Sequence, residues 1–383
     1  MKRLLRASRA VLVLLIAILL HRAVIIRAEP PSEDTERTRV ALEALSRLKG
    51  IDLESNAAVK AAVLRVLEQV RGQPEFVELV RSFKLKGQEP ALLQAAIDRA
   101  EGSAGVEAAR LLLDTGQLDL LRGALEGTNA VAATALTEAL GNTADKRAVP
   151  LLAPLLTDAK RDLALRKQAV RALAQTQDGA ATMLAFAKQD KLPADLKLAA
   201  RAELNAVRWP ALRAEAARLL PLPQSQNAEP LPPVSELAKR AGDPTRGAEV
   251  FSRETVACNR CHQINGQGID FGPNLSEIGA KLAKDALYAA LLDPSAGISF
   301  GFEAWEIELK NGDEAFGLLV SETPDELAIK TQTGIVTRYK KDAIAKREQQ
   351  KISPMPTGLA QTMSEQELVD LVEYLASLRK AGQ

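Results

Sequence analysis

Both cysteines of this 383-residue chain and one of its two histidines lie in one short stretch, Cys258-Asn259-Arg260-Cys261-His262. Cys-x-x-Cys-His is the attachment sequence for a c-type haem. Two thiols three positions apart lie on one helical turn, so each can add to one vinyl group of the porphyrin. The adjacent histidine then lies under the iron and supplies its proximal nitrogen. The spacing predicts one covalent haem c per chain, tethered by Cys258 and Cys261 and ligated by His262.

Three other uses of these cysteines fit the pattern less well. A zinc site needs four ligands, whereas the motif supplies three and the second histidine, His21, belongs to the N-terminal leader. A thioredoxin-like redox pair needs a strand-to-helix context, but residues 243–257 have the pattern of a helix followed by a loop. A structural disulfide, common in exported proteins, leaves the adjacent histidine unexplained.

The sixth ligand of such an iron is sought among the four methionines, because no second histidine is available. Met1 and Met183 belong to the leader and to a helical region, which leaves Met355 and Met363. Met355 lies between two prolines in "SPMPTGL", a stiff loop that presents a thioether at little entropic cost. Met363 directly precedes a helix N-cap, where an apolar side chain packs back on its helix. Because a ligand needs a fixed loop and Met363 has a structural role, we predict Met355 as the axial ligand. A Met/His pair raises the reduction potential and fills both axial positions of the iron.

Two helices are predicted to hold this site. One begins after the N-cap Asp243 and carries Gly247 and Phe251 four residues apart on one face. The other opens with a capping box at residues 364–367 and continues with an apolar stripe towards the C-terminus. A small residue at Gly247 lets the two helices cross closely, with Phe251 and Tyr374 packing near the contact.

This arrangement resembles the class I cytochromes c. The shared features are a helix with Gly-x-x-x-Phe, the Cys-x-x-Cys-His motif, a Gly-Pro-x-Leu loop, a methionine-bearing loop and a C-terminal helix. Residues 272–275, Gly-Pro-Asn-Leu, match the third of these. In that family the proline carbonyl accepts the ring N–H of the proximal histidine, so the resemblance implies this role for Pro273. Such a bond fixes the ring and tunes the iron.

Residues from about 302 to 350 depart from the small cytochromes c. Polar and apolar residues alternate there, and turn signals near Gly312 and Pro324 divide the segment into four or five short strands. We predict a small SH3-like barrel inserted before the Met355 loop. With the Leu-Asp-Pro-Ser and Ser-x-Met-Pro-x-Gly-Leu phrases on either side, residues 243–380 resemble the haem-binding domain of Planctomycetes and Verrucomicrobia. That domain is often fused to HEAT-like repeats or to dehydrogenase-like propellers, and the lack of a propeller here means that no dehydrogenase activity is implied.

The first half of the chain is predicted to be an array of short helices. Residues 37–220 show amphipathic helical patterns separated by Gly, Asn, Asp or Pro. Leu140, Leu173 and Leu204 fall at matching places in three of these patterns, about thirty residues apart. Residues 118–220 resemble a compact form of HEAT repeat, in which each helix pair gains a core by stacking on the next. Such an array is either a scaffold without chemistry or a docking surface for a partner.

A proline-rich segment, residues 221–233, is predicted to be an extended linker between this array and a second domain. Most aromatic residues lie after residue 250, so the two regions have different cores. We predict a cytochrome c domain over residues 234–383, with the β insert at about 302–350. The expected fold class is mainly α: a HEAT-like α-solenoid, then a cytochrome c-like helical domain with a small SH3-like β insert.

The N-terminus is predicted to be an export signal. Positive residues precede an unbroken apolar run from Ala10 to Leu20, which is shorter than the roughly 20 residues that cross a bilayer. Cleavage after Ala28 would remove residues 1–28 as a signal peptide, and an uncleaved segment would be an anchor in the cytoplasmic membrane. Either outcome predicts a periplasmic location. The acidic, proline-containing residues 29–36 are predicted to be disordered.

Together these features predict an exported, monohaem electron carrier with a helical-repeat module that docks a partner. Lys and Arg total 50 against 49 Asp and Glu, so the net charge does not indicate a nucleic-acid partner. The expected partners are redox proteins, an electron donor and an acceptor, with an exported dehydrogenase as one candidate. One alternative is a peroxidase-like haem enzyme or a haem-based sensor with a labile sixth position. Another is an assembly scaffold in which the repeats carry the function.

Overall fold

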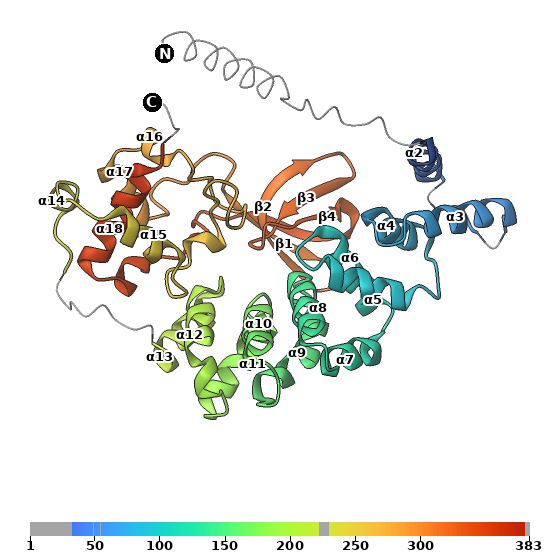
Figure 1. Ribbon diagram of the computed structural model, residues 1–383, viewed down its shortest axis with the longest axis horizontal. Helices are drawn as coiled ribbons and strands as arrows, with labels where there is room; N and C mark the ends of the chain where they lie inside the picture. Colours follow the sequence, from blue (N-terminus) through green and yellow to red (C-terminus); the bar gives the residue numbers. More distant parts are fainter. Residues whose placement is uncertain (1–32, 49, 54, 222–229, 380–383) are drawn as a thin grey trace, which may run out of the picture. The chain divides into compact units, whose positions relative to one another are not determined.

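The computed structural model describes residues 33–48, 50–53, 55–221 and 230–379 (Figure 1). The predicted signal peptide and most of the predicted linker, residues 222–229, lie outside these ranges. The described residues are mainly helical, with one small antiparallel sheet. The chain divides into two compact units after Gln69. Within the described part of the chain, no helix has the length and apolar character needed to cross a bilayer.

The first unit contains helices α2 (Glu33–Ser46) and α3 (Ala57–Gln69), which pack on each other. Because α2 begins at Glu33, residues 33–36 are helical and not disordered as the sequence had suggested, while residues 29–32 lie outside the described residues. Glu36 explains part of the difference, since its carboxylate pairs with Arg39 one turn later at 2.6 Å. Such pairs stabilise an exposed helix.

The second unit begins with a helical array, residues 74–219. Its helices are α4 (Pro74–Phe83), α5 (Glu89–Asp98), α6 (Ser103–Asp114), α7 (Leu118–Glu126), α8 (Ala130–Asn142), α9 (Val149–Thr157), α10 (Leu163–Leu173), α11 (Gln177–Lys188), α12 (Lys197–Ala206) and α13 (Pro210–Leu219). From α7 onwards they alternate between two rows, with α8, α10 and α12 in an inner row and α7, α9, α11 and α13 in an outer row (Figure 1). Helices close in sequence thus pack on one another, while the α-solenoid and HEAT-like assignments stay predictions.

The core of the inner row is built from the leucines that the sequence places at matching positions. Leu140 in α8, Leu173 in α10 and Leu204 in α12 are all buried. The backbones of α8 and α10 approach closely, because a Cβ at Gly141 would lie 2.5 Å from that of Ala172. Helices α10 and α11 are separate, since the Thr176 hydroxyl accepts the N–H of Gly179 at 3.0 Å and caps the start of α11.

The rest of the second unit is a C-terminal domain that begins at residue 230. Its helices are α14 (Val234–Leu237), α15 (Pro244–Ser252), α16 (Ile278–Lys281), α17 (Lys284–Leu292) and α18 (Glu365–Ser377). The Asp243 carboxylate caps α15 by accepting the N–H of Thr245 at 2.8 Å. Ser364 and Glu367 form the predicted capping box at the start of α18. Both predicted helix starts are therefore confirmed.

Helices α15 and α18 cross at Gly247, as the sequence predicts. A Cβ at Gly247 would overlap the carbonyl oxygen of Asp370 and lie 2.6 Å from the Cβ of Tyr374. The rings of Phe251 and Tyr374 meet edge to face beside the crossing, with centroids 5.8 Å apart. Edge-to-face contact is a favoured geometry for aromatic pairs. The crossing therefore depends on a residue without a side chain at position 247.

Asp370 places a carboxylate under this crossing and is only 1% exposed. It accepts the backbone N–H of Asp243 at 2.8 Å, Nε of Arg246 at 2.7 Å and Nε2 of Gln366 at 2.9 Å. Burial alone would raise the pKa of the Asp370 carboxyl, but these hydrogen bonds and the Arg246 charge outweigh it, so the pKa lies below its ordinary value.

We expect Asp370→Asn to lower the free energy of unfolding at neutral pH by about 2 kcal/mol, since hydrogen bonds to a charged group are lost. The wild-type pKa is depressed on folding, so its stabilising effect is full above the unfolded value near 4 and is lost as pH falls through the folded pKa. The variant should therefore show a flatter dependence of Tm on pH below about pH 4. Thermal melts from pH 7 to pH 2 check this, with the exposed Asp285→Asn as control. Equal slopes for Asp370→Asn and wild type would contradict the assignment.

The chain forms a five-stranded antiparallel sheet after α17 and before α18. Its strands are β1 (Ala304–Leu309), β2 (Glu314–Glu322), β3 (Glu326–Lys330), β4 (Val336–Lys340) and β5 (Ile344–Gln349). The order is β4-β3-β2-β1-β5, so the last strand returns to pair with the first. Ile307, Ala315, Leu327 and Ile329 form its small core. The strand segment thus lies where the alternating pattern predicted it, while the SH3-like assignment stays a prediction.

Candidate functional site

The Cys-x-x-Cys-His motif follows α15 and forms a tight 3-10 turn at Cys258–Arg260. Ala257 adopts a left-handed conformation (φ 48°) directly before it. The Cys258 carbonyl then accepts the N–H groups of Cys261 at 3.1 Å and His262 at 2.9 Å. These bonds fix the motif backbone as one compact turn. Both cysteines and the histidine line the same cavity.

His262 is held in one orientation by the loop that follows. Its Nδ1 lies 2.8 Å from the carbonyl oxygen of Pro273, and because a carbonyl can only accept, Nδ1 carries the proton. Burial lowers the pKa of His262, against the opposing effect of this bond, which favours the neutral ring. Nε2 is therefore left with a lone pair, the state in which imidazole ligates a metal. The contact between His262 and Pro273 has the geometry that the family resemblance implied.

A glycine makes room for this imidazole. A Cβ at Gly272 would lie 2.6 Å from Cε1 and 2.8 Å from Nδ1 of His262. Any side chain at this position would therefore push the ring away from Pro273. The glycine of the Gly-Pro-x-Leu loop thus packs flat against the ring, and the next residue supplies the hydrogen-bond acceptor.

The thiols of Cys258 and Cys261 lie in the cavity wall, and burial favours their neutral, protonated form. Burial raises the pKa of Cys258 to about 12, with a smaller contribution from Cys261. Burial also raises the pKa of Cys261, although the Arg260 charge opposes it. The two cysteines are free and not joined in a disulfide. Low thiolate content argues against a thioredoxin-like redox pair, which depends on a depressed cysteine pKa.

The cavity that receives these groups has a volume of about 420 Å³. Met355 lines it together with the neighbouring prolines of its loop, and so do Pro273, Leu275 and Ile278. Met363 is instead buried in the helical core at 2% exposure, packed with residues of α18. The structure therefore brings together every residue that the sequence proposes for the site: Cys258, Cys261, His262, Pro273 and Met355.

These residues fit a c-type haem. A neutral imidazole with a free Nε2 and a thioether are the two axial donors of a Met/His iron site. Two free thiols stand on the wall of the same cavity, and the flat approach of Gly272 leaves the ring unobstructed. Zinc fits less well, because no group of three or more His, Cys, Asp or Glu side chains in the described ranges is arranged to hold a metal ion.

Part of the cavity wall was not anticipated from the sequence. The helical array contributes Glu203, Arg208 and Trp209, and the sheet contributes Phe316 and Tyr339. Glu203 is 57 residues from its partner Arg260, and Arg208 is 106 residues from its partner Glu314. No local pattern signals a pair at such a separation. The one trace in the sequence is that Trp209 is an aromatic residue in a region with few of them.

A family model for cytochrome c matches residues 244–304. The match begins with α15, includes the motif and the loop of Pro273, and ends at the first residue of β1. Among curated proteins, none matches the chain. The match supports a c-type cytochrome domain in the C-terminal part of the chain, with haem as its cofactor. The rest of the sheet, the Met355 loop and α18 lie beyond the matched residues.

Proposed function

We propose that this protein is an exported, monohaem c-type cytochrome that transfers electrons through a His/Met-ligated haem. The observation that carries the proposal is the arrangement around one cavity. His262 is neutral, fixed through Nδ1 and free at Nε2, and both thiols and the Met355 loop line the same space. When bound, the haem supplies a one-electron iron couple.

The residues of the chain then have distinct roles. Cys258 and Cys261 would tether the porphyrin, and His262 and Met355 would ligate the iron. The Pro273 carbonyl holds the His262 ring at 2.8 Å and makes it a better donor. A thioether between two prolines is presented without large loss of entropy, because the backbone of both neighbours is already restricted. Two filled axial positions favour electron transfer over binding at the iron.

The alternative of a haem enzyme or sensor requires a free polar group on the distal side. Arg208 and Trp209 do line the cavity. However, the Arg208 guanidinium is engaged by Glu314 at 2.5 Å and Glu306 at 3.6 Å, and it stacks over Trp209. An arginine committed to two carboxylates is poorly placed to assist chemistry at the iron. The Met355→Ala variant described next distinguishes an electron carrier from a haem enzyme or sensor.

We expect Met355→Ala to convert a six-coordinate, low-spin iron into one with an open or water-filled position. The visible spectrum should lose the features of thioether ligation, and the reduction potential should fall by roughly 0.1 V or more, within the ~0.8 V range that axial ligands span. Met363→Leu is the matched control, since that methionine is buried in the core and a volume-conserving change is tolerated. An unchanged spectrum and potential in Met355→Ala would remove Met355 as ligand and favour the enzyme or sensor alternative.

Export and partner docking are further parts of this proposal. The charged, apolar leader of residues 1–28 supports export as a signal peptide, or as a membrane anchor if it is not removed. The mass of the mature N-terminus distinguishes these outcomes. The redox donor and acceptor are proposed to be proteins, with the HEAT-like array as the module that docks them. If the scaffold alternative holds instead, deleting the array would abolish function while the haem domain keeps its redox activity.

A further inference from the structure

The inner row of the helical array turns its helix ends towards the C-terminal domain. Residues at or just after the C-terminal ends of α8, α10 and α12 line the cavity of the Cys-x-x-Cys-His motif: Gly141, Thr143, Gln175, Asn205 and Val207. Figure 1 shows these three helices on the side of the array that faces the loops of the C-terminal domain. The cavity that begins in the C-terminal domain is therefore lined in part by the helical array.

One contact reaches directly into the attachment motif. Arg260, which lies between the two cysteines, forms an ion pair with Glu203 of α12, in which Nη2 and Oε2 are 3.2 Å apart. Glu203 is 9% exposed, and Arg171 of α10 lies 4.0 Å from the same carboxylate. A buried carboxylate needs such partners, because an unpaired one is strongly destabilising. The array thus supplies the counter-charge for a residue of the haem-attachment turn.

Further contacts flank this pair. Lys167 of α10 lies 3.4 Å from Glu254, four residues before the motif. Arg208, after α12, stacks over Trp209 and over Phe316 of β2, with its Cζ 4.5 Å and 5.3 Å from the two ring centroids. These contacts join α10 to the motif loop and the end of α12 to the sheet.

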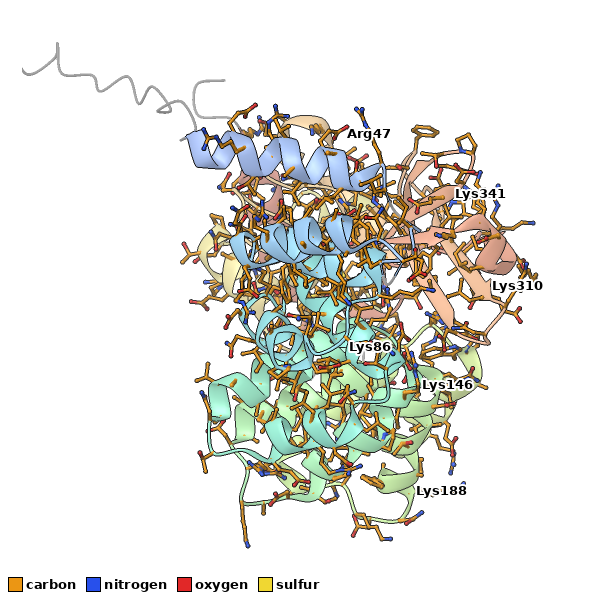
Figure 2. All side chains as sticks on the ribbon, turned by 90° about the vertical axis from the view of Figure 1, so that its right-hand side faces the viewer. Arg47, Lys86, Lys146, Lys188, Lys310 and Lys341 are labelled. Atoms are coloured by element: carbon orange, nitrogen blue, oxygen red, sulfur yellow. The ribbon has the colours of Figure 1, made fainter. Side chains whose placement is uncertain are left out.

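The array also approaches the turn between β1 and β2. A Cβ at Gly312 in that turn would lie 3.7 Å from the Nζ of Lys146. Figure 2 shows Lys146 on the array and Lys310 on the sheet along the same side of this unit. The array therefore contacts both the motif loop and the sheet of the C-terminal domain.

We propose that the inner row is a cover built into the chain, which binds its own cytochrome domain and closes the haem cavity on the side of Cys258 and Cys261. The proposal rests on the proposed function in that the cavity holds a haem. The inner row is then already occupied, so a redox partner reaches the haem from another side. The Arg260–Glu203 pair is the central contact of this interface, because it joins a buried carboxylate of the array to the attachment motif itself.

The test uses the mature, full-length protein with a specific protease site inserted in the linker, residues 221–233. After cleavage, size-exclusion chromatography shows whether the two parts stay together at micromolar concentration. We expect the cleaved wild-type parts to co-elute and the Arg260→Glu parts to bind at least about thirtyfold more weakly, since one partner of a buried charge pair is reversed. Lys239→Glu, an exposed charge reversal on the same domain, is expected to leave binding unchanged.

A second pair of variants keeps the test decisive if Arg260→Glu does not mature. Lys167→Glu should weaken binding a few-fold, as expected for a partly exposed ion pair, and Lys167→Glu/Glu254→Lys should recover it. The proposal would be overturned if the cleaved wild-type parts separated, or if Lys167→Glu/Glu254→Lys failed to recover binding. Haem content is measured on every sample by extraction with acidic organic solvent. Parts that co-elute without haem would contradict the proposed function and leave the interface standing.

Discussion

Cys258→Ser/Cys261→Ser is expected to yield a protein without covalent haem and with a C-terminal domain that no longer folds stably. Serine hydroxyls do not form the thioether links, so the cofactor loses both tethers. The cavity of about 420 Å³ would then lack the apolar group that fills it, and the side chains that line it would be exposed to water. Since cavities in a core are destabilising in proportion to their size, we expect the loss of haem to cost several kcal/mol, enough to unfold a domain of ordinary stability.

The measurement is haem retention on a denaturing gel, together with unfolding followed by circular dichroism. Thr255→Ser changes the same loop three residues before the motif and keeps both thiols, so it should retain full haem. His262→Ala should keep the two tethers but lose the proximal nitrogen, which separates attachment from ligation. A double serine variant that still carried covalent haem would rule out the attachment role of these cysteines.

The features predicted most accurately from the sequence are those set by neighbouring residues. The capping box at Ser364 and Glu367 and the N-cap at Asp243 depend on side chains that bond to backbone groups two or three positions away. The strand segment was located by its period-two pattern and its turn residues. The close crossing at Gly247 was also found, because a glycine and an aromatic residue four positions apart mark one helix face.

The contacts between the array and the C-terminal domain could not be predicted in the same way. The proline-rich segment predicted a linker to a second domain and gave no indication of contacts across it, while the helices from α4 onwards belong to the same compact unit as the C-terminal domain. The Arg260–Glu203 pair depends on how two folded surfaces meet, and charged residues are so frequent in this chain that no single pair stands out. Glu203 also lies within an ordinary amphipathic pattern, where a charged residue is normally assigned to the solvent face.

Gly247→Ala is expected to cause a large loss of stability in the C-terminal domain. The added Cβ would overlap the Asp370 carbonyl oxygen and lie 2.6 Å from the Tyr374 Cβ. Both contacts involve atoms at or next to the backbone of α18, which cannot move aside by changing a rotamer. The helices must separate, and the Phe251–Tyr374 ring contact at 5.8 Å would be lost with them. We expect a loss of about 2–4 kcal/mol in the free energy of unfolding.

The matched control is Gly123→Ala in α7, because a Cβ there meets nothing within 4 Å. Alanine is favoured over glycine in a helix interior by up to ~1 kcal/mol, so this variant should be slightly more stable than wild type. Two identical changes in two helices are thus expected to have opposite signs, and the difference measures packing alone. Urea unfolding followed through the haem absorbance reports Gly247→Ala, and far-ultraviolet circular dichroism reports Gly123→Ala. Equal urea midpoints for the two variants would mean that α15 and α18 do not cross at Gly247. The packing of these two helices would then not explain how His262 is positioned.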